Sequence, residues 1–182
     1  MPTPPPGASP AHARQRRAWC TLTALAPLAA LTGWPGPARA LEPGDAAPRF
    51  VLPGRGGEVD LQALRGRWVY VDFWASWCAP CRLSFPWMAA LHERQRDNGL
   101  VIVAINVDAR QRDATRFLDE LPVPFTIAFD PQGRTPKAWD VRTMPTSVLV
   151  DREGRVRFIH RGFRHEDRQS LEPRIAGAMA AG

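Results

Sequence analysis

Cysteine is scarce in this chain, with three residues among 182. So few cysteines exclude the disulfide framework that holds small secreted scaffolds together. The sequence also lacks internal repeats and long low-complexity linkers. Apolar runs are frequent and 45% of the residues are hydrophobic, which excludes a collagen-like or wholly disordered chain. The composition is typical of a globular protein with one core.

Acidic residues are missing from the segment 1–40, which holds four arginines. The formal net charge of +6 therefore belongs mostly to this segment. The remaining residues are close to neutral and contain no basic block with interleaved aromatic residues. No nucleic-acid partner is expected.

The same segment has the pattern of an export signal. A basic stretch at 14–17 precedes an apolar stretch at 18–34, and Ala38-Arg39-Ala40 is a small-x-small cleavage site. This order predicts a signal peptide at 1–40 with cleavage after Ala40; the alternative is an uncleaved membrane anchor. Cleavage would remove Cys20 and leave Cys78 and Cys81 as the cysteines of a mature domain at 41–182.

Strand and helix patterns alternate along 41–182. Nearly continuous apolar runs at 68–74 and 100–107 predict buried strands. The helix expected between them, at 79–96, makes a βαβ unit with parallel strands. The other expected elements are a hairpin at 49–52 and 58–61, a helix at 112–121, a strand at 125–129, an antiparallel hairpin at 146–151 and 155–160, and a last helix at 166–180. Together they predict an α/β fold with a mixed central sheet flanked by helices on both faces.

The chemistry of the chain is concentrated in Cys78-Ala79-Pro80-Cys81. Two cysteines three residues apart at a helix start lie on one face, so their sulfurs can form a disulfide or separate as a dithiol. Free backbone N–H groups and the helix dipole stabilise a thiolate at the first position. We therefore expect Cys78 to be the attacking thiolate and Cys81, one turn further in, to be the better buried resolving thiol.

Other functions of this cysteine pair have less support in the sequence. A zinc site needs four ligands, and the nearest histidine is His92. Covalent haem attachment needs a histidine where Arg82 stands. A peroxiredoxin-like antioxidant site would need proline and threonine or serine where Val71 and Ala75 stand. No larger metal site is expected, and a two-thiolate Cu(I)-binding chaperone stays open.

The stretch 71–82, Val-Asp-Phe-Trp-Ala-Ser-Trp-Cys-Ala-Pro-Cys-Arg, resembles the active site of thioredoxins. The leader, Pro86, Asn106-Val107 and the triplet at 144–146 resemble the periplasmic TlpA/ResA branch of thiol:disulfide oxidoreductases. The resemblance implies a thioredoxin fold with an added N-terminal β-hairpin. It also implies a monomer that reduces disulfides of periplasmic client proteins, apocytochrome c among them, with the Cys78/Cys81 disulfide as its only redox group. A membrane thiol-reducing donor would then reduce the protein's own disulfide again.

The same resemblance assigns roles around the dithiol. Pro145 would be a cis-proline facing the two sulfurs, with the Met144 backbone free to pair with a client strand. Asp72 would lie beneath Cys81 and relay its proton, with a pKa raised by desolvation. The remaining expected client contacts are Trp77, Ala79, Pro80 and Thr146.

The chain also departs from the branch. Ser84 stands where many members carry glutamate, and a hydroxyl cannot exchange a proton near neutral pH. This argues against an apocytochrome specialisation and leaves Asp72 as the acid/base. The Ala-Pro dipeptide is close to the Gly-Pro of thioredoxin and favours a reductant over an oxidant. Outside the site, we expect core tryptophans at 68, 74, 87 and 139 and surface histidines at 160 and 165.

Overall fold

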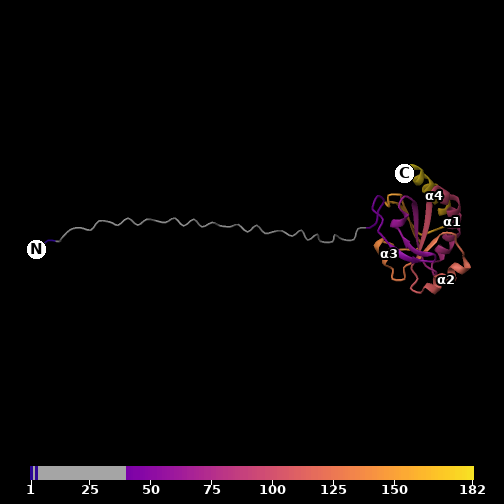
Figure 1. The fold of residues 1–182 in the computed structure, drawn as a ribbon, viewed down its shortest axis with the longest axis horizontal. Helices are drawn as coiled ribbons and strands as arrows, with labels where there is room; N and C mark the ends of the chain where they lie inside the picture. The colour runs from indigo at the N-terminus through magenta and orange to yellow at the C-terminus, as the bar shows by residue number, and fades with distance from the viewer. Residues whose placement is uncertain (2, 4–39) are drawn as a thin grey trace. The chain divides into compact units, whose positions relative to one another are not determined.

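Seven strands form one sheet in the order β2-β1-β5-β4-β3-β6-β7. This computed structural model describes residues 40–182 together with Met1 and Thr3 (Figure 1). The strands are β1 Val51–Gly54, β2 Gly57–Asp60, β3 Trp68–Trp74, β4 Leu100–Asn106, β5 Thr126–Phe129, β6 Thr146–Val150 and β7 Val156–Arg161. The helices are α1 Ala79–Gln95, α2 Gln111–Glu120, α3 Arg134–Ala138 and α4 Asp167–Ala181, with short 3-10 turns at Gln62–Leu64 and Arg96–Asn98.

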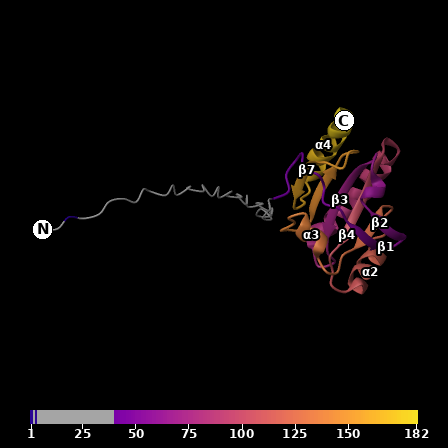
Figure 2. The same cartoon turned by 60° about the vertical axis from the view of Figure 1, so that its left-hand side comes forward.

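The centre of the sheet is the predicted βαβ unit. β3 and β4 are parallel and pair over their full lengths, and β5 continues the parallel set beyond β4. β6 pairs with β3 in the antiparallel sense, and β7 pairs with β6. Figure 2 shows β3 and β4 side by side in the middle of the sheet. The expected mixed sheet is therefore confirmed.

The added N-terminal hairpin, β1 and β2, extends the sheet beyond β5 through one pair of strand residues and a hydrogen bond from the Arg55 N–H to the Ile127 carbonyl oxygen. Gly54 pairs with Ala128 there. A Cβ atom at Gly54 would lie 2.7 Å from the carbonyl oxygen of Gly57 and 2.8 Å from that of Ile127. Any other residue would clash, so glycine is required where the hairpin meets β5.

Alternate residues of β3 face two separate apolar cores. Trp68, Tyr70 and Trp74 pack into the core that α1, α2 and α4 cover. Val69, Val71 and Phe73 pack into the other, which includes Trp139 at the end of α3. Figure 1 shows α3 on one side of the sheet and α1, α2 and α4 on the other. Helices on both faces are thus confirmed. The period-two alternation also directs Asp72, which lies between Tyr70 and Trp74, to the α1 side.

Element boundaries differ from the predicted ones by one or two residues. α4 continues through Pro173. Sequence patterns did not predict α3, because five residues are too few for helical periodicity. The predicted leader lies outside the described residues, apart from Met1, Thr3 and Ala40. Within the described part of the chain, no helix is long and apolar enough to cross a membrane.

Candidate active site

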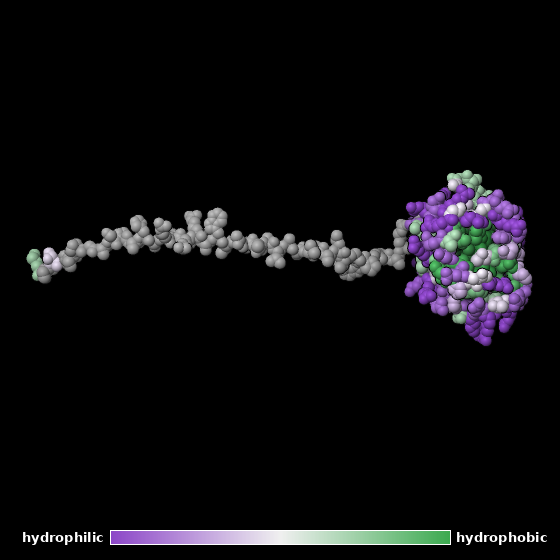
Figure 3. Space-filling view, in the orientation of Figure 1, coloured by the Kyte–Doolittle hydropathy of each residue, from purple (hydrophilic) through white to green (hydrophobic). Residues whose placement is uncertain are grey.

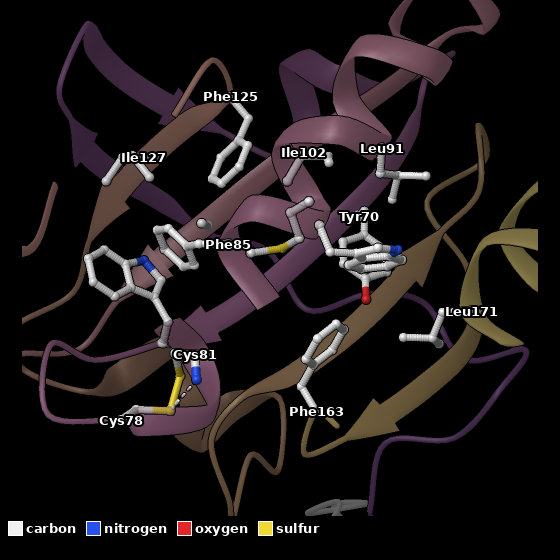
Figure 4. Close-up of a cluster of buried hydrophobic side chains, with 14 of the residues drawn as sticks. Tyr70, Cys78, Cys81, Phe85, Leu91, Ile102, Phe125, Ile127, Phe163 and Leu171 are labelled. Atoms are coloured by element: carbon white, nitrogen blue, oxygen red, sulfur yellow. Dashed lines mark hydrogen bonds between the residues drawn. A yellow bond between two sulfur atoms is a disulfide. The ribbon is translucent and has the colours of Figure 1, made fainter. Parts of the chain in front are cut away.

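The two cysteines lie where β3 gives way to α1. Cys78 is the N-cap of α1, and its Sγ accepts a hydrogen bond from the backbone N–H of Cys81 at 3.2 Å. Pro80 lies in the first turn, where a missing N–H loses no helical hydrogen bond. The sulfurs form a disulfide with an S–S distance of 2.02 Å and a Cα–Cα distance of 5.3 Å (Figure 4).

The two sulfurs differ in their access to solvent. Cys78 is 5% exposed, whereas Cys81 is fully buried. Both belong to the aromatic core on the α1 side of the sheet, in which Figure 4 shows Phe85 and Tyr70. The expected order of burial is confirmed. An incoming sulfur can therefore reach only Cys78, and the N–H groups of the first turn are in place to stabilise its thiolate.

A buried carboxylate holds the loop that carries the cysteines. Asp108 accepts hydrogen bonds from the backbone N–H of Ser76 at 3.0 Å and from the Ser76 hydroxyl at 3.1 Å. Asn106, the last residue of β4, donates to the same carboxylate at 2.8 Å and accepts from the Asp108 N–H at 3.0 Å. Asp108 is 5% exposed. Sequence reasoning missed Asp108; the available signal was two polar residues at the carboxyl end of a buried parallel strand.

The bond between Met144 and Pro145 is cis, as predicted. Pro145 immediately precedes β6, and Thr146 of β6 pairs with Phe73 near the end of β3. The proline therefore lies at the same end of the sheet as the carboxyl end of β3, where the loop that carries the cysteines starts. Met144 packs against the core that contains both cysteines.

The expected client contacts differ in exposure. Trp77 is 72% exposed and Ala79 is exposed, while Pro80 and Met144 are half-buried. Thr146 is buried, and its hydroxyl donates to the carbonyl oxygen of Thr143 at 2.7 Å. The Thr146 side chain is thus bound within the protein and does not form part of the exposed rim.

Asp72 is fully buried on the face of β3 that α1 covers. Ser147 of β6, opposite it, donates its hydroxyl to Oδ1 at 2.6 Å, while Oδ2 has no hydrogen-bond partner. Burial raises the pKa of Asp72 to about 7, and the Ser147 hydrogen bond acts in the opposite direction. The expected desolvation shift is confirmed. The neighbouring hydroxyl of Tyr70 is also buried without a partner, and burial together with Asp72 raises its pKa.

Ser84 lies inside α1, one turn after Cys81, and is 2% exposed. Its hydroxyl donates to the carbonyl oxygen of Cys81 at 3.0 Å. The side chain therefore satisfies a backbone acceptor close to the resolving cysteine and carries no charge. Asp72, by contrast, is a fully buried acid.

The residues expected outside the site are mostly where the sequence placed them. The four tryptophans at 68, 74, 87 and 139 are buried in the cores. His165 is exposed, but His160 is half-buried and its Nε2 lies 3.5 Å from Asp167. The surface assignment of His160 was wrong, because α4 packs back over β7 and brings Asp167 to it. No group of three or more His, Cys, Asp or Glu residues in the described ranges could hold a metal ion.

Known proteins have sequences similar to this chain. A family model described as Redoxin matches residues 42–175. Thiol-disulfide oxidoreductase ResA of Bacillus subtilis (strain 168) is 35% identical over 114 residues, which are 62% of this chain and 64% of that protein. ResA of Geobacillus kaustophilus is 34% identical over 120 residues, which are 65% of this chain and 69% of that protein. The chain thus spans slightly less than two thirds of the Bacillus subtilis protein.

A solved structure extends the similarity over the whole fold. The crystal structure of a putative thiol:disulfide interchange protein DsbE from Chlorobium tepidum matches with a TM-score of 0.76 and 49% identity. The match covers 77% of this chain and 99% of that one. The chain belongs to the Redoxin family of the thioredoxin superfamily, and it is a thiol-disulfide oxidoreductase of the ResA and DsbE type.

Proposed function

We propose that the protein is an exported reductase that opens disulfides in periplasmic client proteins. The observation that carries the proposal is the unequal exposure of two bonded sulfurs at one helix start. Cys78 is 5% exposed and its Sγ accepts the Cys81 N–H, whereas Cys81 is fully buried. One sulfur is accessible for attack and the other is protected until the first exchange has taken place.

The exchange has two steps. The Cys78 thiolate attacks one sulfur of the client disulfide, and the client's second sulfur leaves as a thiolate. The Cys81 thiolate then attacks Cys78 Sγ, which closes the Cys78–Cys81 disulfide and releases the client's first sulfur. Two electrons pass to the client, whose thiolates take up two protons. The protein's disulfide is reduced again by a membrane thiol donor.

Asp72 is the group that exchanges a proton with the resolving cysteine. Cys81 must lose its proton before it can attack, and a base works best when its pKa lies near the working pH. Burial raises the pKa of Asp72 to about 7. The carboxylate faces the α1 side of the sheet, as Cys81 does, and its Oδ2 has no protein partner. It accepts the proton in the forward direction and returns it when the disulfide is reduced.

The client binds around the exposed rim. Trp77 and Ala79 are exposed beside Cys78, and Pro80 follows them. On the β6 side, the backbone of Met144 pairs with an extended client segment, whereas the Pro145 carbonyl oxygen already accepts the Gly162 N–H at 2.8 Å. Four of the side chains assigned to client binding thus remain accessible, whereas Pro145 and Thr146 are buried.

The sequence supports three further parts of the proposal, which are export of the protein, a membrane thiol donor and the reducing direction of the exchange. The pattern at 1–40 supports delivery to the periplasm, where a reductant needs a membrane donor, and the Ala-Pro dipeptide supports the reducing direction. Apocytochrome c is one class of client within this proposal. The neutral Ser84 argues against specialisation for it, because its hydroxyl donates to the carbonyl oxygen of Cys81 and cannot exchange a proton near neutral pH.

Reduction of insulin or of a disulfide-linked model peptide tests the proposal. The protein supplied with a thiol donor should reduce either substrate catalytically, and Cys78→Ser should abolish the reaction. Cys81→Ser is the matched control, because it keeps the attacking thiol and should react once without turnover. Cu(I) retention without disulfide exchange, or peroxide consumption without client reduction, would overturn the proposal in favour of a copper chaperone or a peroxidase.

A further inference from the structure

A cleft of about 310 Å³ opens beside the cysteine loop. Ser76 and Trp77 of the loop and Arg82 of α1 line one side, and the other side comes mainly from α2. Trp77 directly precedes Cys78, so the cleft begins one residue from the exposed sulfur. α1 and α2 lie on the same side of the sheet (Figure 1). Any segment bound at Cys78 can therefore extend into this cleft.

The residues that line the cleft carry more positive than negative charge. Arg82 pairs with Glu120 at 3.1 Å, and Arg110 pairs with Asp113 at 2.8 Å. Arg116 also lines the cleft and is exposed, yet it has no ion pair among the described residues. Each carboxylate of the cleft is thus engaged by an arginine, and one guanidinium is left without a counter-charge.

Aromatic rings form the rest of the cleft. The Arg82 guanidinium lies 4.7 Å from the centroid of the Phe117 ring, which holds it in place together with Glu120. Trp77 is 72% exposed at the rim. Much of the surface in Figure 3 is hydrophilic, so a largely exposed tryptophan next to the reactive sulfur is a natural contact for a partner. The cleft therefore suits a side chain with an aliphatic stem and a carboxylate.

We propose that this cleft binds an acidic side chain of the client, from the segment that flanks the client's disulfide cysteine, and that Arg116 pairs with its carboxylate. The inference rests on the proposed function and specifies its substrate class. An extended chain advances about 3.3–3.6 Å per residue, so the acidic residue lies within a few positions of the client cysteine. Basic residues at the same place are disfavoured, because the carboxylates of Asp113 and Glu120 already have partners.

Three disulfide-linked peptides test the inference. They are identical except for one residue two positions from the cysteine, which is Glu, Gln or Lys. The reduced protein should open the Glu peptide about two- to five-fold faster than the Gln peptide at low ionic strength, the range expected of one exposed ion pair. The Lys peptide should be the slowest. The preference should disappear in high salt.

Variants of α2 assign the preference to the cleft. Arg116→Gln should bring the Glu/Gln rate ratio to about one, and Arg116→Glu should bring it below one. Lys137→Glu is the matched control, because Lys137 is an exposed cation of α3 that does not line the cleft. It should keep the ratio above one.

The outcomes separate the two proposals. If all three peptides are reduced at equal rates, or if Lys137→Glu lowers the ratio as much as Arg116→Glu, the cleft does not select acidic clients although the protein remains a reductase. If none of the peptides is reduced, the proposed function itself fails.

Discussion

Ser147 donates its hydroxyl to Asp72 across two neighbouring strands, with 2.6 Å between the oxygen atoms. This bond joins the strand that follows the cis-proline to the strand that leads into the cysteine loop. Asp72 is fully buried, and its other carboxyl oxygen has no hydrogen-bond partner. Burial therefore raises the proton affinity of Asp72, and the hydrogen bond from the Ser147 hydroxyl lowers it.

Asp72→Asn should stabilise the oxidised protein in alkaline solution. The unfolded carboxyl ionises near its ordinary pKa of 3.8, whereas the folded one stays protonated up to a pKa of about 7. The wild-type protein thus loses stability as the pH rises from about 4 to 7, and the loss reaches about 4 kcal/mol above that range. Asparagine cannot ionise and escapes this loss.

Denaturant unfolding at pH 4 and pH 8 checks the prediction. The two proteins should have similar unfolding free energies at pH 4, and the variant should be the more stable at pH 8. The same variant should slow the release of client from the mixed disulfide, because it cannot accept the Cys81 proton. An Asp72→Asn protein that is no more stable than wild type at pH 8 would show that the carboxyl ionises freely.

Ser147→Ala should raise the pKa of Asp72 further. The Ser147 hydroxyl stabilises the ionised carboxylate and so lowers its pKa, while burial raises it. Without the hydroxyl only the raising effect remains. NMR titration of the Asp72 carboxyl carbon measures the change, and Ser147→Thr, which keeps a hydroxyl, is the control. An unchanged or lower pKa in Ser147→Ala would mean that the hydrogen bond does not act on the charged form.

Asp108→Ala should loosen the cysteine loop. The substitution leaves the Ser76 N–H, the Ser76 hydroxyl and the Asn106 amide without their acceptor. Unpaired buried donors of this kind cost about 1–3 kcal/mol in unfolding free energy. Amide hydrogen exchange at Ser76 and Trp77 should accelerate, whereas the exposed Asp119→Ala should change neither quantity. Equal amide exchange rates at Ser76 and Trp77 in both variants would show that Asp108 does not hold the cysteine loop in place.

Cys81→Ser should accumulate a mixed disulfide with client. Cys78 can still attack, but no buried thiol remains to release the product. Mass spectrometry of the trapped complex should find nearly all of it linked through Cys78. Cys78→Ser should trap little client, since Cys81 is fully buried. Efficient trapping through Cys81 would reverse the order of attack.

The sequence predicted the elements whose patterns are long and local. The apolar runs of β3 and β4 and the helix between them were located to within about two residues, because each pattern repeats over seven or more positions. The first cysteine at the helix start followed from the same local pattern. α3 was missed because it is too short to show a period.

The supporting contacts of the site could not be predicted in the same way. Ser147 and Asp72 are 75 positions apart, and Ser76 and Asp108 are 32 apart. Only strand order and register bring such pairs together. The cleft beside Trp77 likewise needs α1 and α2 on one face of the sheet, which residue patterns leave open. His160 was misplaced for the same reason.

The redox equilibrium between the Cys78/Cys81 couple and glutathione tests the central claim most directly. Oxidised and reduced protein can be separated by thiol alkylation at defined glutathione ratios, which gives the reduction potential. A reductase should have a potential below about −250 mV, near the thioredoxin value. A potential above about −150 mV would make the protein an oxidant and contradict the account.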